Sequence, residues 1–285
     1  MAEHEHIHSV HRIVLCTLDS LYSGVALHKL VTAFPERVVL IVASKRYGGK
    51  YGSFFRQIRK NWARGGYAFV TYLSFHFIYH YAFLYVSDAI NMLLRRPKKV
   101  YSVRQLAKRF AIPLIYTSNP NAEDTLARIR AAKPDLIVSA YFDHVIRQEL
   151  INLPTFGVIN VHTSLLPDFR GPFPSLWPLI HNAERIGVSV HYINSEELDS
   201  GPIILQKTCE RRADESVLGT DCRLFSEGIE LVNRAIIMIE EGTVRAVAHE
   251  KKGRYFSFPR RADLAELRRH GIPLVRLRDV ISRYL

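Results

Sequence analysis

The chain has 285 residues, 48% of them apolar and 23% charged, which is the composition of an ordinary globular protein able to bury a sizeable core. Its three cysteines, Cys16, Cys209 and Cys222, lie far apart, which argues against a disulfide framework and favours a reducing compartment. The N-terminal stretch is polar and lacks the apolar segment of a secretory signal, so we expect a cytoplasmic protein.

The formal net charge of +12 is concentrated in one part of the chain. Residues 45–109 hold 14 Lys and Arg and a single acid, Asp88, whereas the remainder holds 25 Lys and Arg against 26 Asp and Glu. The basic character therefore concerns the partner of one segment, and we expect no nucleic-acid partner for the protein as a whole.

In chain order, apolar runs rich in β-branched residues predict strands at 11–17, 37–44, 112–117, 135–140 and 157–162. Helix-like segments, notably 18–34 and 121–132, separate these runs. Near-continuous apolar strands that alternate with helices are typical of an α/β fold with a mostly parallel sheet covered on both faces. Two further strands are expected at 187–193 and 202–208, followed by a long amphipathic helix over 215–241. The remaining residues, 243–285, form a short, basic, turn-rich extension.

The segment 65–87, GGYAFVTYLSFHFIYHYAFLYVS, contains no Lys, Arg, Asp or Glu and is rich in Tyr and Phe. Its histidines and hydroxyl groups suit hydrocarbon poorly, and both of its flanks are basic, which argues against a membrane-spanning helix. We expect either a helix on an anionic membrane surface or in a dimer interface, or a core helix hairpin with solvated basic ends.

The motif VINVHTSLLPDFRG, at 158–171, places polar side chains where the fifth predicted strand ends. Ligands of parallel sheets collect at the carboxyl ends of the strands, and residues two apart on a strand face the same side. Asn160 and His162 are therefore held together, as an amide donor and an imidazole that can stabilise negative charge on a carbonyl oxygen. The turn that follows crosses this site, and we expect substrate contacts from Ser164, Arg170 and Gly171.

Asp199, in the turn sequence ELDSGPII, is the best candidate to orient the imidazole and accept a proton. Taken singly, the Asn, the His and the Asp each fit a turn former or a satisfied polar residue. Their spacing and the intervening turns together favour a catalytic site.

NVHTSLLPDFRG resembles the Asn-x-His-x-Ser-Leu-Leu-Pro-x-x-(Arg/Lys)-Gly motif of folate-dependent formyltransferases, and GVSVHYINSEELDSGPIILQ is similar to the second half of that motif. The likeness extends from about 134 to 242. It implies a Rossmann-like sheet, a formyltransferase activity with 10-formyltetrahydrofolate as the formyl donor, and catalytic roles for Asn160, His162 and Asp199. It further implies a catalytic domain over 1–242, with 45–109 as an insertion and 243–285 as the extension.

The same resemblance implies contacts to the pterin ring of the folate, largely through the backbone, from two segments. The first segment is Phe142, Asp143, His144, Val145 and Ile146. The second segment is the loop 194–199, with Asn194, Glu196 and Leu198. No metal is implied, and we assign none to the histidines of the N-terminal stretch, His4, His6, His8 and His11.

The formyl acceptor is an open question between branches of this family. The strand sequence with His191 looks most like the glycinamide ribonucleotide branch, but the segment LCTLDSLYSG has too few glycines for a phosphate loop. Forty-three C-terminal residues are too few for the tRNA-binding domain of the methionyl-tRNA branch. By elimination we expect an amino sugar on a nucleotide carrier, with the insertion binding a nucleotide diphosphate or a membrane surface.

Two alternatives remain. One is the related hydrolase that deformylates 10-formyltetrahydrofolate with water, which usually carries a small-molecule-sensing domain that we do not find. The other is a non-catalytic binding protein at a membrane surface built on the same scaffold.

Overall fold

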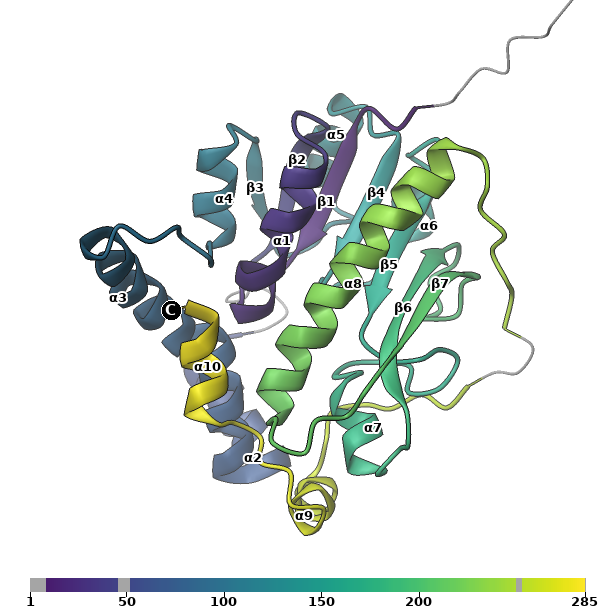
Figure 1. The fold of residues 1–285 in the computed structure, drawn as a ribbon. Helices are drawn as coiled ribbons and strands as arrows, with labels where there is room; N and C mark the ends of the chain where they lie inside the picture. Colours follow the sequence, from purple (N-terminus) through teal and green to yellow (C-terminus); the bar gives the residue numbers. More distant parts are fainter. Residues whose placement is uncertain (1–8, 46–51, 250–252, 285) are drawn as a thin grey trace, which may run out of the picture.

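The computed structural model describes residues 9–45, 52–249 and 253–284, so that His4, His6 and His8 lie outside the described residues. A single seven-stranded sheet with the order β3-β2-β1-β4-β5-β6-β7 forms the centre (Figure 1). Its strands are β1 (Ile13–Thr17), β2 (Val38–Ser44), β3 (Leu114–Thr117), β4 (Leu136–Ala140), β5 (Val158–His162), β6 (Ile186–Ile193) and β7 (Ile203–Cys209).

Strands β1 to β5 are parallel, and β6 and β7 join the sheet antiparallel. The expected α/β fold with a mostly parallel sheet is therefore confirmed. Because β5 and β6 run in opposite directions, side chains of β6 are brought opposite those at the carboxyl end of β5.

Helices cover both faces of the sheet. On one face, α1 (Leu21–Ala33) and the long α8 (Val217–Glu240) bury their apolar stripes against the strands. On the other face, α5 (Glu123–Ala131) and the short α6 (Gln148–Ile151) do the same. Two shorter helices are α4 (Val103–Arg109), before β3, and α7 (Leu176–Ile180), between β5 and β6.

The basic insertion folds as α2 (Phe54–Ser74), a π-helical turn (Phe75–Tyr79) and α3 (His80–Leu93). Gly66 breaks α2 with a left-handed φ of 70°, a conformation that favours glycine. One face of this insertion joins the main core through Phe69, Tyr72 and Leu84, as the core-helix interpretation expects. Its opposite face is exposed. Within the described ranges, the structure contains no helix that is both long and apolar enough to cross a bilayer.

A buried polar cluster ties the insertion to the sheet domain. Asp221 on α8 accepts hydrogen bonds from the hydroxyl groups of Tyr22, Tyr72 and Ser175, the one from Tyr72 at 2.5 Å. The Nε2 atom of His76, on the π-helical turn, lies 3.8 Å from the same carboxylate. The cluster thus joins α1, α2, α8 and the segment before α7.

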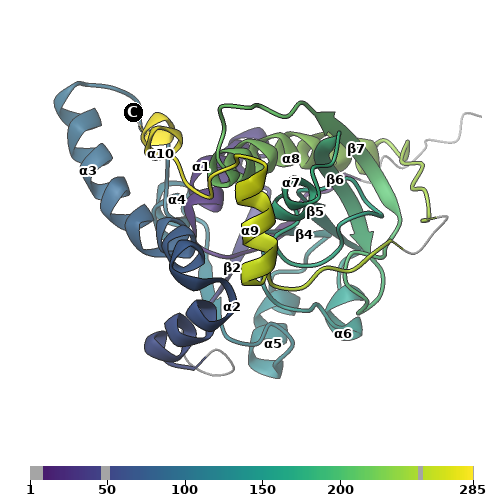
Figure 2. The same cartoon turned by 90° about the horizontal axis from the view of Figure 1, so that it is seen from below.

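The C-terminal segment packs against both the sheet domain and the basic insertion. Helix α9 (Arg261–Arg269) lies against α7 and α2, and α10 (Leu277–Tyr284) lies against α3 and α8 (Figure 2). Leu267 and Val280 are buried in the main core. The expected extension 243–285 therefore shares the hydrophobic core of the sheet domain and holds the insertion in place.

Candidate active site

Asn160 and His162 lie at the carboxyl end of β5, as the sequence predicts, and both meet polar partners there. Asn160 is directly opposite His191 in the antiparallel pair β5–β6, and its Nδ2 atom is 3.1 Å from His191 Nε2. His162 is buried, and its Nε2 atom is 3.0 Å from the carbonyl oxygen of Phe169. The strand pairing thus adds a second imidazole to the pair that the sequence identifies.

Asp199 reaches both histidines from the loop between β6 and β7. Its Oδ1 atom is 3.4 Å from His162 Nδ1 and 3.6 Å from His191 Nε2. Its Oδ2 atom accepts the backbone N–H of Gly171 at 2.8 Å. The four side chains therefore form one connected group that runs from Asn160 through His191 and Asp199 to His162.

The environment of this group shifts the pKa values of Asp199 and His162. Burial opposes the ionisation of Asp199, but the facing His162 and His191 and the Gly171 N–H hold the pKa of its carboxyl well below the usual range. Burial lowers the pKa of His162, and the nearby Asp199 carboxylate partly opposes this effect. At neutral pH the site accordingly holds an ionised carboxylate beside a predominantly neutral imidazole.

Arg170 occupies a position different from the expected one at the mouth of the site. Its side chain is only 4% exposed, and its Nε atom donates to the carbonyl oxygen of Leu198 at 3.0 Å. Its Nη2 atom donates to the same oxygen and to Glu197 Oε1. The guanidinium therefore fastens the Asp199 loop, and this geometry lends no support to the expected contact with a substrate anion.

Gly171 and Ser164 shape the turn that crosses the site. Gly171 has a left-handed φ of 102°, and a Cβ atom there would fall 2.2 Å from the carbonyl oxygen of Phe256. The chain at 254–256 passes this close because Phe256 N–H donates to the Arg170 carbonyl at 2.8 Å. The Ser164 hydroxyl is fully buried and donates to the Asp168 carbonyl at 3.2 Å, so it braces the turn.

The two segments expected to contact the pterin ring are both present as loops. After β4, His144 is buried and its Nε2 atom lies 2.9 Å from Ser44 Oγ, and Ile146 is also buried. Val145 is 41% exposed, with its carbonyl oxygen accepting from Asn121. Phe142 is half-buried, and Asp143, Asn194, Glu196 and Leu198 are exposed. No metal-binding group of three or more His, Cys, Asp or Glu is found in the part of the chain that the structure describes.

Sequence reasoning missed His191 as a site residue. The signal was present, because His191 has the two-residue periodicity of its strand, but only the register between β5 and β6 shows that it faces Asn160. The role of Glu197 as the partner of Arg170 was also missed.

Comparison with known proteins places this geometry in a family. The formyl transferase family model matches residues 88–236, which is more than half of the chain. The chain therefore belongs to the formyl transferase family, the one whose motif the sequence resembles.

Among its relatives, the methionyl-tRNA formyltransferase of Fusobacterium nucleatum is 35% identical over 159 residues, which are 55% of this chain and 51% of that protein. The chain spans about half the length of the curated relatives it matches.

Two solved structures share the fold. A sugar N-formyltransferase from Shewanella is 18% identical with a TM-score of 0.55, covering 91% of this chain and 87% of that one. The N-formyltransferase from Helicobacter canadensis, in complex with folinic acid and dTDP-3-aminofucose, is 16% identical with a TM-score of 0.53, covering 86% of this chain and 70% of that one.

Proposed function

We propose that this protein transfers the formyl group of 10-formyltetrahydrofolate to a primary amine. The observation that carries the proposal is the connected group of Asn160, His162, His191 and Asp199 at the carboxyl end of β5. It combines donors for an oxyanion with an ionised carboxylate, which is the equipment that acyl transfer requires. Membership of the formyl transferase family supports the same reaction.

In the proposed reaction, the lone pair of the amine attacks the formyl carbon and a new carbon–nitrogen bond forms. The amide N–H of Asn160 donates to the oxyanion of the tetrahedral intermediate, and the His162 ring turns from the Phe169 carbonyl to donate its Nε2–H to the same oxygen. The Asp199 carboxylate accepts the proton that the attacking nitrogen must lose. That proton passes to N10 of the folate as the bond between N10 and the formyl carbon breaks, so that tetrahydrofolate leaves neutral at this nitrogen.

For the acceptor, we propose an amino sugar on a nucleotide carrier. The N-terminus of α1, where a phosphate loop would present backbone N–H groups, is closed in this chain. Ser20 and Ser23 form a capping box there, and both are buried, as is Tyr22 beside them. This arrangement argues against glycinamide ribonucleotide as the acceptor. The Helicobacter canadensis structure, which holds a nucleotide-linked amino sugar, supports an acceptor of this kind.

Methionyl-tRNA is the second candidate acceptor. It is favoured by the 35% identity to a methionyl-tRNA formyltransferase, although this match covers only half of that protein. Within this chain we propose a catalytic domain over 1–242 followed by an extension at 243–285. Both candidates place the protein in the cytoplasm.

The test is the release of tetrahydrofolate from 10-formyltetrahydrofolate, followed by absorbance with each acceptor in turn. We expect turnover with a nucleotide-linked amino sugar and none with water alone. Turnover with methionyl-tRNA would show that methionyl-tRNA, and not an amino sugar, is the acceptor. Turnover with water would show that the protein is a hydrolase. Folate binding without turnover under every condition would contradict the catalytic proposal and favour a binding protein on this scaffold.

A further inference from the structure

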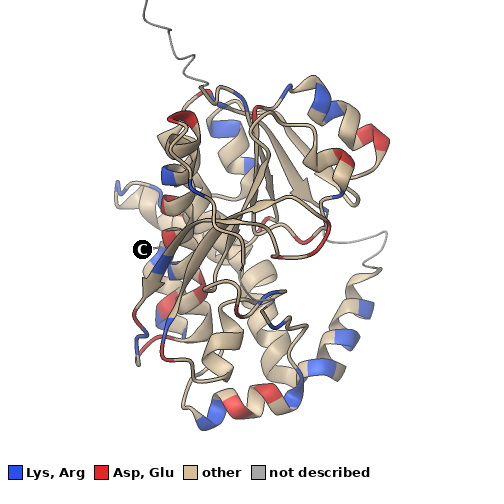
Figure 3. Cartoon of the chain, turned by 90° about the vertical axis from the view of Figure 1, so that its right-hand side faces the viewer, with Lys and Arg blue, Asp and Glu red and all other residues tan. Residues whose placement is uncertain are grey.

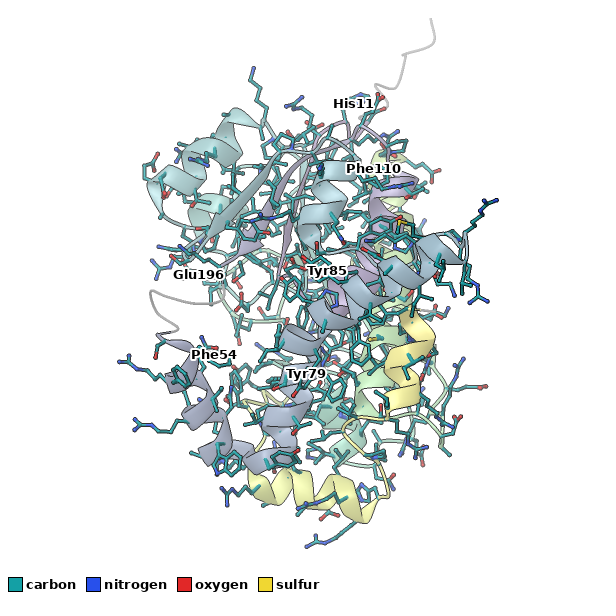
Figure 4. The ribbon with its side chains drawn as sticks, turned by 90° about the vertical axis from the view of Figure 1, so that its left-hand side faces the viewer. His11, Phe54, Tyr79, Tyr85, Phe110 and Glu196 are labelled. Atoms are coloured by element: carbon teal, nitrogen blue, oxygen red, sulfur yellow. The ribbon has the colours of Figure 1, made fainter. Side chains whose placement is uncertain are left out.

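The outer face of α3 carries an exposed apolar stripe. Along the chain its members recur three or four residues apart, which places them on one side of a helix. We call this set the outer stripe: Ile78, Ala82, Tyr85, Val86, Ala89, Met92 and Leu93. Its largest side chains are well exposed, with 67% of Tyr85, 80% of Met92 and 81% of Leu93 open to solvent. Figure 4 views the molecule from this side, with Tyr85 labelled on α3.

This stripe is additional to the face that holds α3 on the protein. Leu84, Ser87 and Asn91 are buried on that inner face, and Asn91 donates to the carbonyl oxygen of Tyr284. An ordinary surface helix is apolar on its inner side and charged on its outer side. A continuous exposed apolar surface on a folded protein marks a place where something else binds.

The charge around the outer stripe is positive. The C-terminal end of α3 projects far from the sheet (Figures 1 and 2). Met92 and Leu93 are the last residues of this helix, and the exposed Arg95 and Arg96 follow after Leu94. Asp88 does not offset these charges, because it pairs with Lys98 at 2.5 Å and accepts from Gln105.

The first half of α2 adds more positive charge to the same insertion. Arg56, Arg59 and Lys60 are exposed there, and Figure 3 shows Lys and Arg gathered on this helix with no Asp or Glu among them.

We propose that the outer stripe docks the protein on an anionic lipid surface. Apolar side chains flanked by Arg, with tyrosine rings between them, match the boundary between acyl chains and negatively charged headgroups. The helix would lie in that boundary with Met92 and Leu93 inserted and the arginines at headgroup level.

Two other occupants fit less well. A symmetric contact between two copies of this chain would bring one basic insertion against another, which is unfavourable. A nucleic acid would need positive charge spread across the contact itself, whereas the outer stripe is uncharged from Ile78 to Leu93.

The experiment is co-sedimentation of the full chain with vesicles of phosphatidylcholine alone and of phosphatidylcholine and phosphatidylglycerol in equal parts. Three variants are compared with the unmodified protein. Met92→Ser/Leu93→Ser removes the apolar anchor, Arg95→Asn/Arg96→Gln removes the charge, and Ile237→Ser/Val247→Ser is a matched control at exposed apolar positions outside the insertion.

We expect binding to the anionic vesicles only, with the control unchanged. The anchor variant should bind about tenfold more weakly, and the charge variant about thirtyfold more weakly at low salt. Because all four replaced side chains of these two variants are exposed and lie outside the catalytic group, the formyl-transfer rate in solution should not change. Failure of docking can thus be distinguished from failure of the proposed activity.

Several outcomes would overturn the proposal. These are no binding to anionic vesicles, or binding that the anchor variant leaves intact. Self-association in sedimentation velocity that the anchor variant abolishes would assign the stripe to a second copy. Tighter binding to transfer RNA than to vesicles, lost in the charge variant and kept in the anchor variant, would assign the basic segment to nucleic acid.

Discussion

Asp199 and Asp221 are two largely buried carboxylates in the same domain, both near histidine, and their pKa values are shifted in opposite directions. Asp199 faces His162 and His191 and accepts a backbone N–H, and its pKa lies well below the usual range. Burial raises the pKa of Asp221 from its ordinary 3.8 to about 6, against the hydroxyl donors Ser175, Tyr22 and Tyr72. Burial acts on both groups, so the difference lies in what faces the carboxylate.

The difference between the two pKa shifts indicates which carboxylate is suited to catalysis. Imidazoles that can carry positive charge stabilise an ionised carboxylate strongly, whereas neutral hydroxyl groups compensate only part of the desolvation. Asp199 is therefore ionised at neutral pH and can accept a proton during turnover. Asp221 instead holds the insertion against α8. For this structural function the charged form is unfavourable, because burial opposes ionisation of the carboxyl.

The largest expected effect is on catalysis at Asp199. Replacing Asp199 with Asn keeps the shape but removes the anion that orients His162 and accepts the proton. We expect kcat/KM to fall roughly a thousandfold, while the fold is retained with a lower midpoint of thermal unfolding, because the contacts of the carboxylate with His162 and His191 are lost. Tetrahydrofolate release and thermal unfolding measure the two properties. A variant with near-normal turnover would show that Asp199 is no more catalytic than Asp221.

The second effect is on stability at Asp221. Replacing Asp221 with Ala leaves the buried hydroxyls of Tyr22, Tyr72 and Ser175 without their acceptor. We expect a loss of about 3 kcal/mol in the free energy of unfolding, with turnover per folded molecule retained. Denaturant titration measures the loss. Asp214→Ala, at an exposed ion pair with Arg278, is the control and should cost less than about 1 kcal/mol.

The third effect is a dependence of stability on pH, with opposite signs for the two carboxylates. Folded Asp221 binds its proton more tightly than the unfolded chain does, so its contribution to stability is present in acid and is lost as the pH rises through about 6. The loss amounts to at most about 3 kcal/mol. Asp199, with its lowered pKa, contributes stability above the ordinary aspartate range and loses it as the pH falls.

Unfolding titrations at a series of pH values, repeated with Asp221→Asn, measure this dependence. The variant should flatten the decline between pH 4 and 6, which are the approximate pKa values of the unfolded and folded carboxyl. An unchanged slope would mean that the Asp221 carboxyl is not the group that titrates there.

The smallest effect concerns a single hydroxyl. Replacing Tyr72 with Phe removes one of the three donors to Asp221 and should cost about 1 kcal/mol. Because that hydrogen bond lowers the pKa of Asp221, its loss should also move the titration midpoint of Asp221 upward. The measurement is the same pH series. A midpoint that moves downward would contradict the assigned direction of the hydrogen bond.

The sequence predicts the sheet and three of the four side chains of the candidate site because their signals are local. The five parallel strands are apolar runs, and Asn160, His162 and Asp199 belong to two recognisable motifs. His191 and the buried position of Arg170 depend on strand register and on a loop that folds back, which no local pattern encodes. The hydrogen bonds to Asp221 join residues 46 to 199 positions apart. The members of this cluster therefore look unrelated until the chain has folded.

The close passage of residues 254–256 beside Gly171 has a consequence for the order of events during synthesis. Chains fold progressively from the N-terminus as they are made. The turn beside Asp199 acquires its outer neighbour only when Phe256 can bond to Arg170, and α10 closes over the insertion later still. The residues that brace the turn are therefore synthesised after the sheet, both histidines and the carboxylate, and we expect the turn beside Asp199 to take its final form only once residue 256 has been added.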